Sequence, residues 1–349
     1  MTPTNRMLVF ASRPTDLVGP EHFRTVEAAV PDLAPGEALV RVRVLGIDPT
    51  QRTWLNPEET YISPARLGRV MPGSGVGQVV DTRNPSFPIG AWVFGMTGWQ
   101  SYVVAREEMG IFGLNLVPPG VRPEDMLGIF GPSGLAAYFG MLDIARPVEG
   151  QTALVTGAAG STGSIAGQIG RILGCRTVGS AGGDYKCRWV VDTANFDGCI
   201  DYKSEPLADR LVELAPSGID IVFDNVGGEA LEAALDHLAP GARVVLCGSI
   251  SSRYRSRSYG RGPGNYMQLA FKRARMEGFI FLDYADRFPE AFDRLKTWRD
   301  AGLLTVATSV SEGLESAPSA LAGLFTGKNL GKQLVRVAAQ CAAKELSPW

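Results

Sequence analysis

The stretch Val155-Thr156-Gly157-Ala158-Ala159-Gly160-Ser161-Thr162-Gly163 decides the fold. The apolar run 153–156 predicts a strand, and 161–173 has the apolar spacing of a helix. A turn of the form Ala-x-Gly-x-x-Gly between a strand and a helix is the fingerprint of a dinucleotide site, whereas an isolated glycine-rich turn could be a connection that binds nothing. Gly160 would let a pyrophosphate approach the backbone, and Gly163 would let the helix pack closely on the strand, with free N–H groups at its start.

The pattern continues on both sides of this turn. Strands are expected at 153–156, 177–180, 219–223 and 243–247, and helices at 126–142, 161–173, 206–214, 229–238 and 289–301. Alternating strands and helices predict an α/β domain with a doubly wound parallel sheet. Because these strands lack polar alternation, we expect both faces of the sheet to be buried.

The first third of the chain has a different pattern. Short β-type runs at 7–11, 37–45, 77–82, 91–95 and 100–104 are separated by glycine and proline, which predicts an all-β, barrel-like domain. The residues 305–337 return to strand, helix and strand. At 349 residues the chain exceeds the size of a single core, and we divide it into a substrate domain 1–127, a nucleotide domain 128–303 and a segment 304–349 that returns to the first domain.

Composition excludes several classes of protein. With 34 basic and 36 acidic residues the net charge is −2, so we expect neither nucleic-acid nor membrane binding through overall charge. We find neither an apolar signal core at the N-terminus nor a run long enough to span a bilayer, and we expect a cytoplasmic protein. Five cysteines without a close pair predict free thiols, and we interpret the regular spacing of the first three as chance: Cys175, Cys187, Cys199, Cys247 and Cys341.

The residues after the second strand distinguish the two nicotinamide dinucleotides. An NAD site usually places a carboxylate there, about 20 residues beyond the turn, to hold the ribose hydroxyl. This strand ends in Ser180-Ala181-Gly182-Gly183, and Asp184 is as readily interpreted as a helix cap. Lys186 and Arg188 could neutralise a 2′-phosphate, which favours NADPH, although they could also form a solvated helix face.

Ordered motifs along almost the whole chain carry a family resemblance. They are Asp48-Pro49 with Arg52, Gly73 to Gly77, Gly95-Met96 with Gly98-Trp99-Gln100, Ala137 to Gly140, Gly160 to Gly163, Asp201-Tyr202-Lys203, Phe223 to Gly228, Cys247-Gly248, Met276 to Phe279, and Gly327 to Lys332. With them the chain resembles the zinc-independent branch of the medium-chain dehydrogenase/reductase superfamily, which includes prostaglandin and leukotriene reductases, plant alkenal double-bond reductases and curcumin-reductase-like enzymes. The resemblance implies a Rossmann domain, an N-terminal GroES-like β-barrel domain completed by the C-terminal tail, and a homodimer that pairs near 278–284.

The resemblance also implies a set of cofactor-binding residues. Gly160, Ser161, Thr162 and Gly163 would hold the pyrophosphate, and Lys186 and Tyr202 the 2′-phosphate of NADPH. The nicotinamide half would be lined by Asn225, Cys247, Gly248, Ser249, Phe279, Ile280, Phe281 and Asn329.

The sequence argues against a zinc site. Its only histidines are His22 and His237, and a catalytic zinc needs about three protein ligands. Where zinc-dependent relatives place their ligands, the chain has Gly46-Ile47-Asp48 and Gly73-Ser74-Gly75. We therefore expect no metal, and we place His237 at a helix C-terminus.

The chemistry implied by the resemblance is reduction of the carbon–carbon double bond of α,β-unsaturated ketones and aldehydes. Hydride from NADPH would reach the β-carbon, and a proton the α-carbon. Tyr254 is the candidate proton donor, with solvent as the alternative. Thr50 and Gln51 replace the usual Tyr and Met of the family motif and Ala136 replaces a Thr, so we expect a reshaped substrate pocket.

Other functions stay open at this point. A quinone oxidoreductase would share the fold and the cofactor site. The arginine-rich stretch 253–261 could attract an acidic unsaturated substrate, or could be a solvated loop. A non-catalytic NADPH-binding protein is a further alternative, because a fold does not fix a function.

Overall fold

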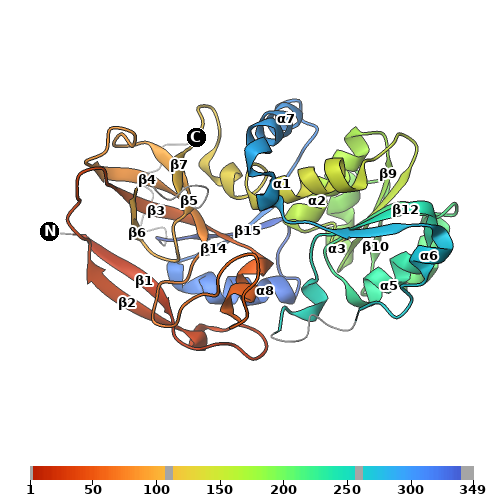
Figure 1. Ribbon diagram of the computed structural model, residues 1–349, viewed down its shortest axis with the longest axis horizontal. Helices are drawn as coiled ribbons and strands as arrows, with labels where there is room; N and C mark the ends of the chain where they lie inside the picture. Colours follow the sequence, from red (N-terminus) through yellow and green to blue (C-terminus); the bar gives the residue numbers. More distant parts are fainter. Residues whose placement is uncertain (1–2, 107–112, 256–261, 339–349) are drawn as a thin grey trace. The chain divides into compact units, whose positions relative to one another are not determined.

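The computed structural model describes residues 3–106, 113–255 and 262–338, and the chain forms two compact units (Figure 1). The first unit contains the residues up to Leu127, together with Ser309–Thr326 and the residues from Gln333 onward. The second unit contains Gly128–Thr308 and the short segment Gly327–Lys332.

The second unit is built on a six-stranded sheet with the order β10-β9-β8-β11-β12-β13. Its strands are β8 (Thr152–Thr156), β9 (Arg176–Ala181), β10 (Gly198–Asp201), β11 (Ile219–Asp224), β12 (Leu238–Leu246) and β13 (Arg275–Gly278). All neighbouring strands are parallel. The strand order reverses between β8 and β11, so this is the doubly wound sheet that the sequence predicted, and ligands bind at the carboxyl ends of the strands at such a reversal.

Helices cover the two faces of this sheet. They are α1 (Pro132–Phe139), α2 (Ser161–Ile172), α3 (Asp184–Asp192), α4 (Leu207–Leu214), α5 (Gly228–Asp236), α6 (Gln268–Lys272) and α7 (Phe288–Asp300). Helix α1 packs against α2 and α7, whereas α5 packs against α4 and α6, and Figure 1 shows α5 and α6 at the lower right. Each of β8 to β12 has at least one fully buried apolar side chain, and examples are Leu154, Val178, Ile200, Val222 and Val244. Burial from both sides explains why these strands read as continuous apolar runs.

The prediction of one long helix at 126–142 is wrong. The chain forms a 3-10 turn at Pro123–Leu127, then α1, then a π-helical turn at Gly140–Ala145. Gly131 is extended, and Pro132 opens α1 at a position where a missing N–H is harmless. Apolar residues occupy the whole stretch, so the periodicity alone did not reveal the break.

The first unit has a seven-stranded sheet centred on β3 (Ala38–Ile47). The order is β14-β15-β3-β4-β5-β7, with β6 pairing β3; the other strands are β4 (Ser74–Thr82), β5 (Trp92–Met96), β6 (Tyr102–Ala105), β7 (Leu114–Leu116), β14 (Thr308–Glu312) and β15 (Lys332–Arg336). A separate ribbon pairs β1 (Thr4–Phe10) with β2 (Phe23–Ala29). Among the described residues β14 and β7 are open edges, so the predicted β-barrel does not close.

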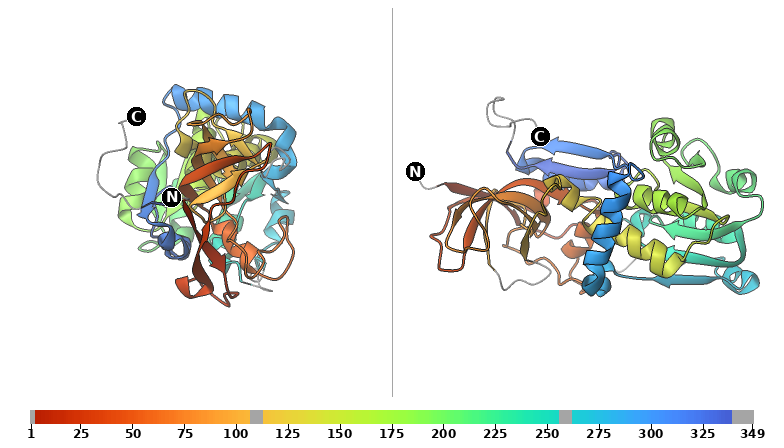
Figure 2. Two further views of the ribbon diagram at one scale, coloured as in Figure 1. Left: turned by 90° about the vertical axis from the view of Figure 1, so that its left-hand side faces the viewer. Right: turned by 90° about the horizontal axis from the view of Figure 1, so that it is seen from above.

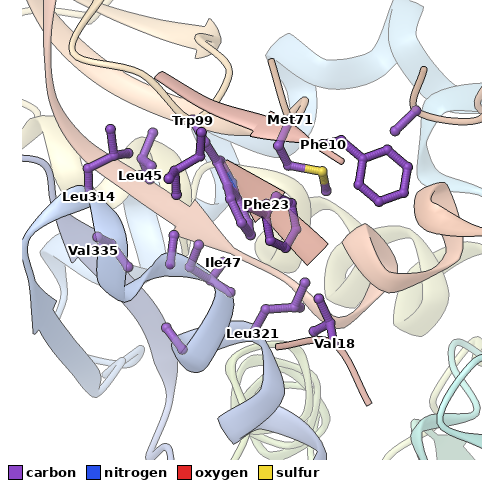
Figure 3. Packing of buried hydrophobic residues seen from close by; sticks show 14 of the residues in the cluster. Phe10, Val18, Phe23, Leu45, Ile47, Met71, Trp99, Leu314, Leu321 and Val335 are labelled. Carbon is purple, nitrogen blue, oxygen red and sulfur yellow. The ribbon is translucent and has the colours of Figure 1, made fainter. Parts of the chain in front are cut away.

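The tail supplies part of the core of the first unit. Helix α8 (Ala317–Phe325) contributes Leu321 and β15 contributes Val335, both fully buried in one cluster with Trp99 and Phe23 (Figure 3). The right-hand view of Figure 2 shows β14 and β15 side by side. The returning tail therefore completes this core, whereas Gly327–Lys332 belongs to the second unit. In the described part of the chain, we find no helix with the length and apolar character needed to cross a membrane.

Candidate functional site

The glycine-rich turn lies at the carboxyl end of β8. Gly157 has a φ of 65°, and its carbonyl accepts a hydrogen bond from the Gly160 N–H at 2.9 Å. A Cβ on Gly163 would lie 2.4 Å from the Gly157 oxygen, closer than any real contact. A larger residue at Gly163 would therefore push the start of α2 away from the strand.

The start of α2 has an unsatisfied polar group. Gly160 is the N-cap residue and provides no side chain to cap the helix. The Ser161 hydroxyl oxygen is buried and finds no hydrogen-bond partner among the described residues. A buried hydroxyl without a partner is unfavourable, and the first N–H groups of a helix favour an anion. This end of α2 fits the pyrophosphate of a dinucleotide.

The segment Gly327–Lys332 lies beside the same turn. The Gly331 N–H donates to the Ala159 carbonyl at 2.8 Å, and Gly331 forms a parallel bridge with Gly160. The Asn329 side chain donates to the Gly331 carbonyl at 2.9 Å. The structure thus brings Asn329 next to the glycine-rich turn.

A second polar group gathers beyond β9. The Lys186 ammonium donates to the Gly327 carbonyl at 2.9 Å. A Cβ on Gly182 would lie 2.6 Å from the Tyr202 hydroxyl and 3.0 Å from Cε of Lys203. Lys186, Tyr202 and Lys203 therefore lie around the end of β9, where the adenosine ribose is expected.

The charges of this group fit a phosphate. Burial lowers the pKa of Lys186, and the positive charge of Lys203 lowers it further. Within the described part of the chain, neither ammonium group forms a close ion pair with a carboxylate, although the charge of Lys203 is near enough to lower the pKa of Asp201. A phosphate dianion would favour the charged form of Lys186 and so oppose the effects of burial and of the Lys203 charge on its pKa. Lys203 was missed as a site residue, although it was already part of the Asp201-Tyr202-Lys203 motif.

The neighbouring charged residues have structural partners. The Asp201 carboxylate accepts hydrogen bonds from the Gly183 and Lys203 N–H groups at 2.7 and 3.0 Å. Burial alone would raise the pKa of Asp201, but these bonds and one from Ser204 lower it. Arg188 forms an ion pair with Asp184 at 2.9 Å, and Gly183 is the N-cap residue, so Asp184 does not cap α3.

A buried network joins the ends of β8 and β11, where the strand order reverses. The Asp224 carboxylate is fully buried and accepts hydrogen bonds from the Thr156 hydroxyl at 2.7 Å and the Gly227 N–H at 3.0 Å. The Asn225 side chain donates to the Thr156 carbonyl at 2.8 Å. Burial raises the pKa of Asp224, although its hydrogen bonds oppose that rise. The sequence pointed to Asn225, but it did not reveal the roles of Thr156 and Asp224.

The residues after β12 join this network. The N–H groups of Cys247 and Gly248 donate to the Asp224 carbonyl at 2.9 and 3.1 Å. Burial and the nearby Asp224 charge raise the pKa of the Cys247 thiol to about 12. The Ser249 N–H donates to the Tyr254 hydroxyl oxygen at 2.9 Å, which fixes the phenol next to Gly248.

The predicted cofactor-binding residues after β13 have different surroundings. A Cβ on Gly140 would lie 2.8 Å from the Phe279 ring and 2.6 Å from the Phe223 ring, so Phe279 packs at the end of β11. Ile280 is the N-cap of a 3-10 turn, and the Phe281 ring packs on Phe288, with 6.0 Å between centroids. The arginine-rich stretch is described only to Arg255, because 256–261 lie outside the described residues.

We find no cluster of three or more metal-ligating side chains in residues 3–106, 113–255 and 262–338. His237 is the C-cap residue of α5, and its Nδ1 lies 3.0 Å from the Ala233 carbonyl, as the sequence predicted.

Comparisons with known proteins agree with this geometry. Residues 6–112 match the family model described as the N-terminal domain of oxidoreductase, and 161–297 match the model described as zinc-binding dehydrogenase. The NADPH-dependent curcumin reductase of Escherichia coli strain K12 is 38% identical over 342 residues, covering 96% of this chain and 97% of that protein. The NADP(+)-dependent 2-alkenal reductase of Nicotiana tabacum is 35% identical over 315 residues, covering 90% of each. The crystal structure of CurA from Vibrio vulnificus in complex with NADPH has a TM-score of 0.88 and 38% identity, covering 95% of this chain and 99% of that one.

Proposed function

We propose, from the premise that the chain belongs to the medium-chain dehydrogenase/reductase family of curcumin and alkenal reductases, that it reduces the carbon–carbon double bond of α,β-unsaturated ketones and aldehydes. It is an NADPH-dependent oxidoreductase of the kind that acts on such bonds. The observation that supports the cofactor site most directly is the buried Ser161 hydroxyl without a described partner at the start of α2.

Different polar groups of the second unit would bind different parts of the cofactor. The turn Gly160–Gly163 would hold the pyrophosphate through backbone N–H groups and the Ser161 hydroxyl. Lys186 and Tyr202, with Lys203 beside them, would hold the 2′-phosphate. Asn225 and Cys247 to Ser249 would surround the nicotinamide at the reversal of strand order.

NADPH supplies the hydride, and the protein has to orient the substrate and stabilise the charge that develops on its oxygen. The Tyr254 hydroxyl is held next to Gly248 by the Ser249 N–H, so it is fixed at the end of the sheet where the nicotinamide is expected. From there it would donate a hydrogen bond to the enolate oxygen or pass a proton to the α-carbon. This chemistry uses no metal, and we propose a zinc-independent reaction.

The test incubates the enzyme with a panel of enones, enals and quinones and with NADPH that carries deuterium at the position of the transferred hydride. We expect deuterium on the β-carbon of saturated ketone products, at a rate that a metal chelator does not change. Oxidation of NADPH by quinones alone would identify a quinone oxidoreductase instead. Binding of NADPH with no turnover of any enone, enal or quinone would contradict an enzymatic role.

A further inference from the structure

Two cysteines meet beneath the proposed 2′-phosphate site. Cys187 lies in α3 and Cys199 in β10, and their Sγ atoms are 2.9 Å apart. A disulfide requires about 2.05 Å between the sulfurs, so a shift of less than about 1 Å would join them. Cys187 is buried and Cys199 is partly exposed, and both are free thiols. The regular spacing of the first three cysteines, interpreted above as chance, did not predict this contact.

The pair links the two elements that carry the phosphate-binding residues. Cys187 directly follows Lys186 on α3, and Cys199 precedes Asp201 and Tyr202 at the end of β10. The Asp201 carboxylate already holds the Gly183 N–H at the start of α3. A covalent bond between the sulfurs would thus act on the same junction that positions Lys186.

We propose that Cys187 and Cys199 are a redox-active thiol pair that a hydroperoxide converts into a disulfide, and that this disulfide weakens NADPH binding. The second half of this statement rests on the proposed cofactor site. No role in hydride transfer is assigned to either sulfur.

The reaction balances with one hydroperoxide for each pair. One thiol loses its proton, and its sulfur attacks the terminal peroxide oxygen, which breaks the O–O bond and releases an alcohol or water. The second thiol then attacks the resulting sulfenic acid, so the S–S bond forms and water leaves. Two thiols are oxidised by two electrons, and the peroxide is reduced by two.

The surroundings of the sulfurs set the expected rate. Burial raises the pKa of both thiols, which keeps them protonated near neutral pH. Because the thiolate is the attacking species, oxidation is expected to become faster as the pH rises toward the pKa values of the two thiols. The 2.9 Å contact makes the second step intramolecular, so little sulfenic acid should accumulate.

Closing the disulfide should change the cofactor site by moving α3. Contraction of the sulfur contact draws α3 toward β10, and Lys186 moves with its neighbour Cys187. The Lys186 ammonium is held by the Gly327 carbonyl at 2.9 Å, so its position is sensitive to such a shift. We expect the KM for NADPH to rise about tenfold, the size of one charge-assisted hydrogen bond, with kcat nearly unchanged.

The first experiment detects the bond itself. The full-length protein is treated with hydrogen peroxide under native conditions at mildly alkaline pH. It is then unfolded in a denaturant that contains an alkylating agent, which blocks the free thiols, and digested with trypsin. Trypsin cuts after Lys186, Arg188 and Lys203, so the disulfide should join the dipeptide Cys187-Arg188 to the peptide 189–203. Cys175 and Cys247, which lie apart from this pair, should still be alkylated in the same sample.

Two results would overturn the proposal. The first is full alkylation of Cys187 and Cys199 after peroxide treatment, because the sulfurs would then not have joined. The second is an oxidised enzyme that contains the linked peptide but has an unchanged KM for NADPH. Cys199→Ser, which cannot form the bond, should keep its KM through the same treatment, and dithiothreitol should restore the KM of the wild type.

The cofactor site is tested separately with the reduced enzyme. If Lys186→Ala leaves the KM for NADPH unchanged, the proposed 2′-phosphate site is wrong, whatever the oxidised protein does. A linked peptide in that case would still establish the thiol pair, so the two failures are distinguishable.

Discussion

Lys186 is a single side chain on which the choice between the two nicotinamide dinucleotides should depend. It lies on α3 beside Tyr202 and Lys203, and it has no ion pair with a described carboxylate. The sequence suggested the same role for Arg188, two residues further on, but in the structure Arg188 forms an ion pair with Asp184. Two positions along α3 thus separate the proposed phosphate-binding lysine from an arginine that forms a surface ion pair.

Lys186→Ala should raise the KM for NADPH by about 10- to 100-fold, because a hydrogen bond to a charged group contributes about 1.5 to 3 kcal/mol. The KM for NADH should hardly change, since NADH has no 2′-phosphate. Steady-state kinetics with both cofactors measures the effect. Arg188→Ala is the matched control, and an equal loss in that variant would contradict the assignment.

The same residue predicts a pH dependence. Burial and the charge of Lys203 lower the pKa of Lys186, so its ammonium loses a proton earlier than an ordinary lysine as the pH rises. The KM for NADPH should therefore increase from neutral to alkaline pH, while the KM for NADH stays flat. Kinetic profiles of the wild type and Lys186→Ala check this, and a rise that persists in the variant would assign the titration to another group.

At the scale of the element, the helices and strands around the turn were predictable and the links between them were not. The run 153–156 and the helix after it agree with β8 and α2, because strand and helix periodicities are local. The Thr156 hydroxyl bond to Asp224 joins residues 68 positions apart, and nothing local in either strand predicts it. Likewise, strands β2, β7, β10 and β13 were missed; β7, β10 and β13 are too short for a clear alternation.

Thr156→Val tests the side-chain hydrogen bond that joins the ends of β8 and β11. It removes the hydroxyl that donates to Asp224 and accepts from the Asn225 N–H, and leaves the buried carboxylate and the partly buried N–H without that partner. We expect a loss of about 1 to 3 kcal/mol in the free energy of unfolding, measured by urea denaturation. Thr156→Ser keeps the hydroxyl and should lose much less; equal losses would point to packing of the methyl group instead.

Leu321→Ala tests the contribution of α8 to the first unit. Leu321 is fully buried in the cluster with Trp99, so its truncation should destabilise the protein by about 2 to 5 kcal/mol. Leu67→Ala removes the same atoms from a side chain that is 53% exposed, and should have little effect. Urea denaturation followed by tryptophan fluorescence compares the two, and similar losses would contradict a structural role for the tail.

At the scale of the whole molecule, alternation of strands and helices predicted the doubly wound sheet, and the strand order agrees with it. The barrel was expected from the short strands and from the family resemblance, and the spacing of strands in a sequence carries no information on whether the edges of a sheet meet. Among the described residues β14 and β7 remain edges, and β1 and β2 pair only with each other as strands. The resemblance to known reductases supplied the cofactor assignment that composition and periodicity left open.

A homodimer is the remaining expectation from that resemblance. Strand β13 is an edge of the parallel sheet, and the residues after it form a 3-10 turn at Phe281–Arg287, so strand pairing between subunits could involve only part of 278–284. Light scattering coupled to size-exclusion chromatography should give twice the 37.3 kDa mass of the chain. A monomer at micromolar concentration would contradict the expectation.

The six residues Gly327–Lys332 have a consequence for protein engineering. They belong to the nucleotide-binding unit and bond to Ala159 and Lys186, while the residues on either side of them belong to the first unit. A fragment that stops near Thr308 would lack this segment, which lies beside the glycine-rich turn. The cofactor module of this enzyme therefore cannot be transplanted into another protein as one uninterrupted piece of gene.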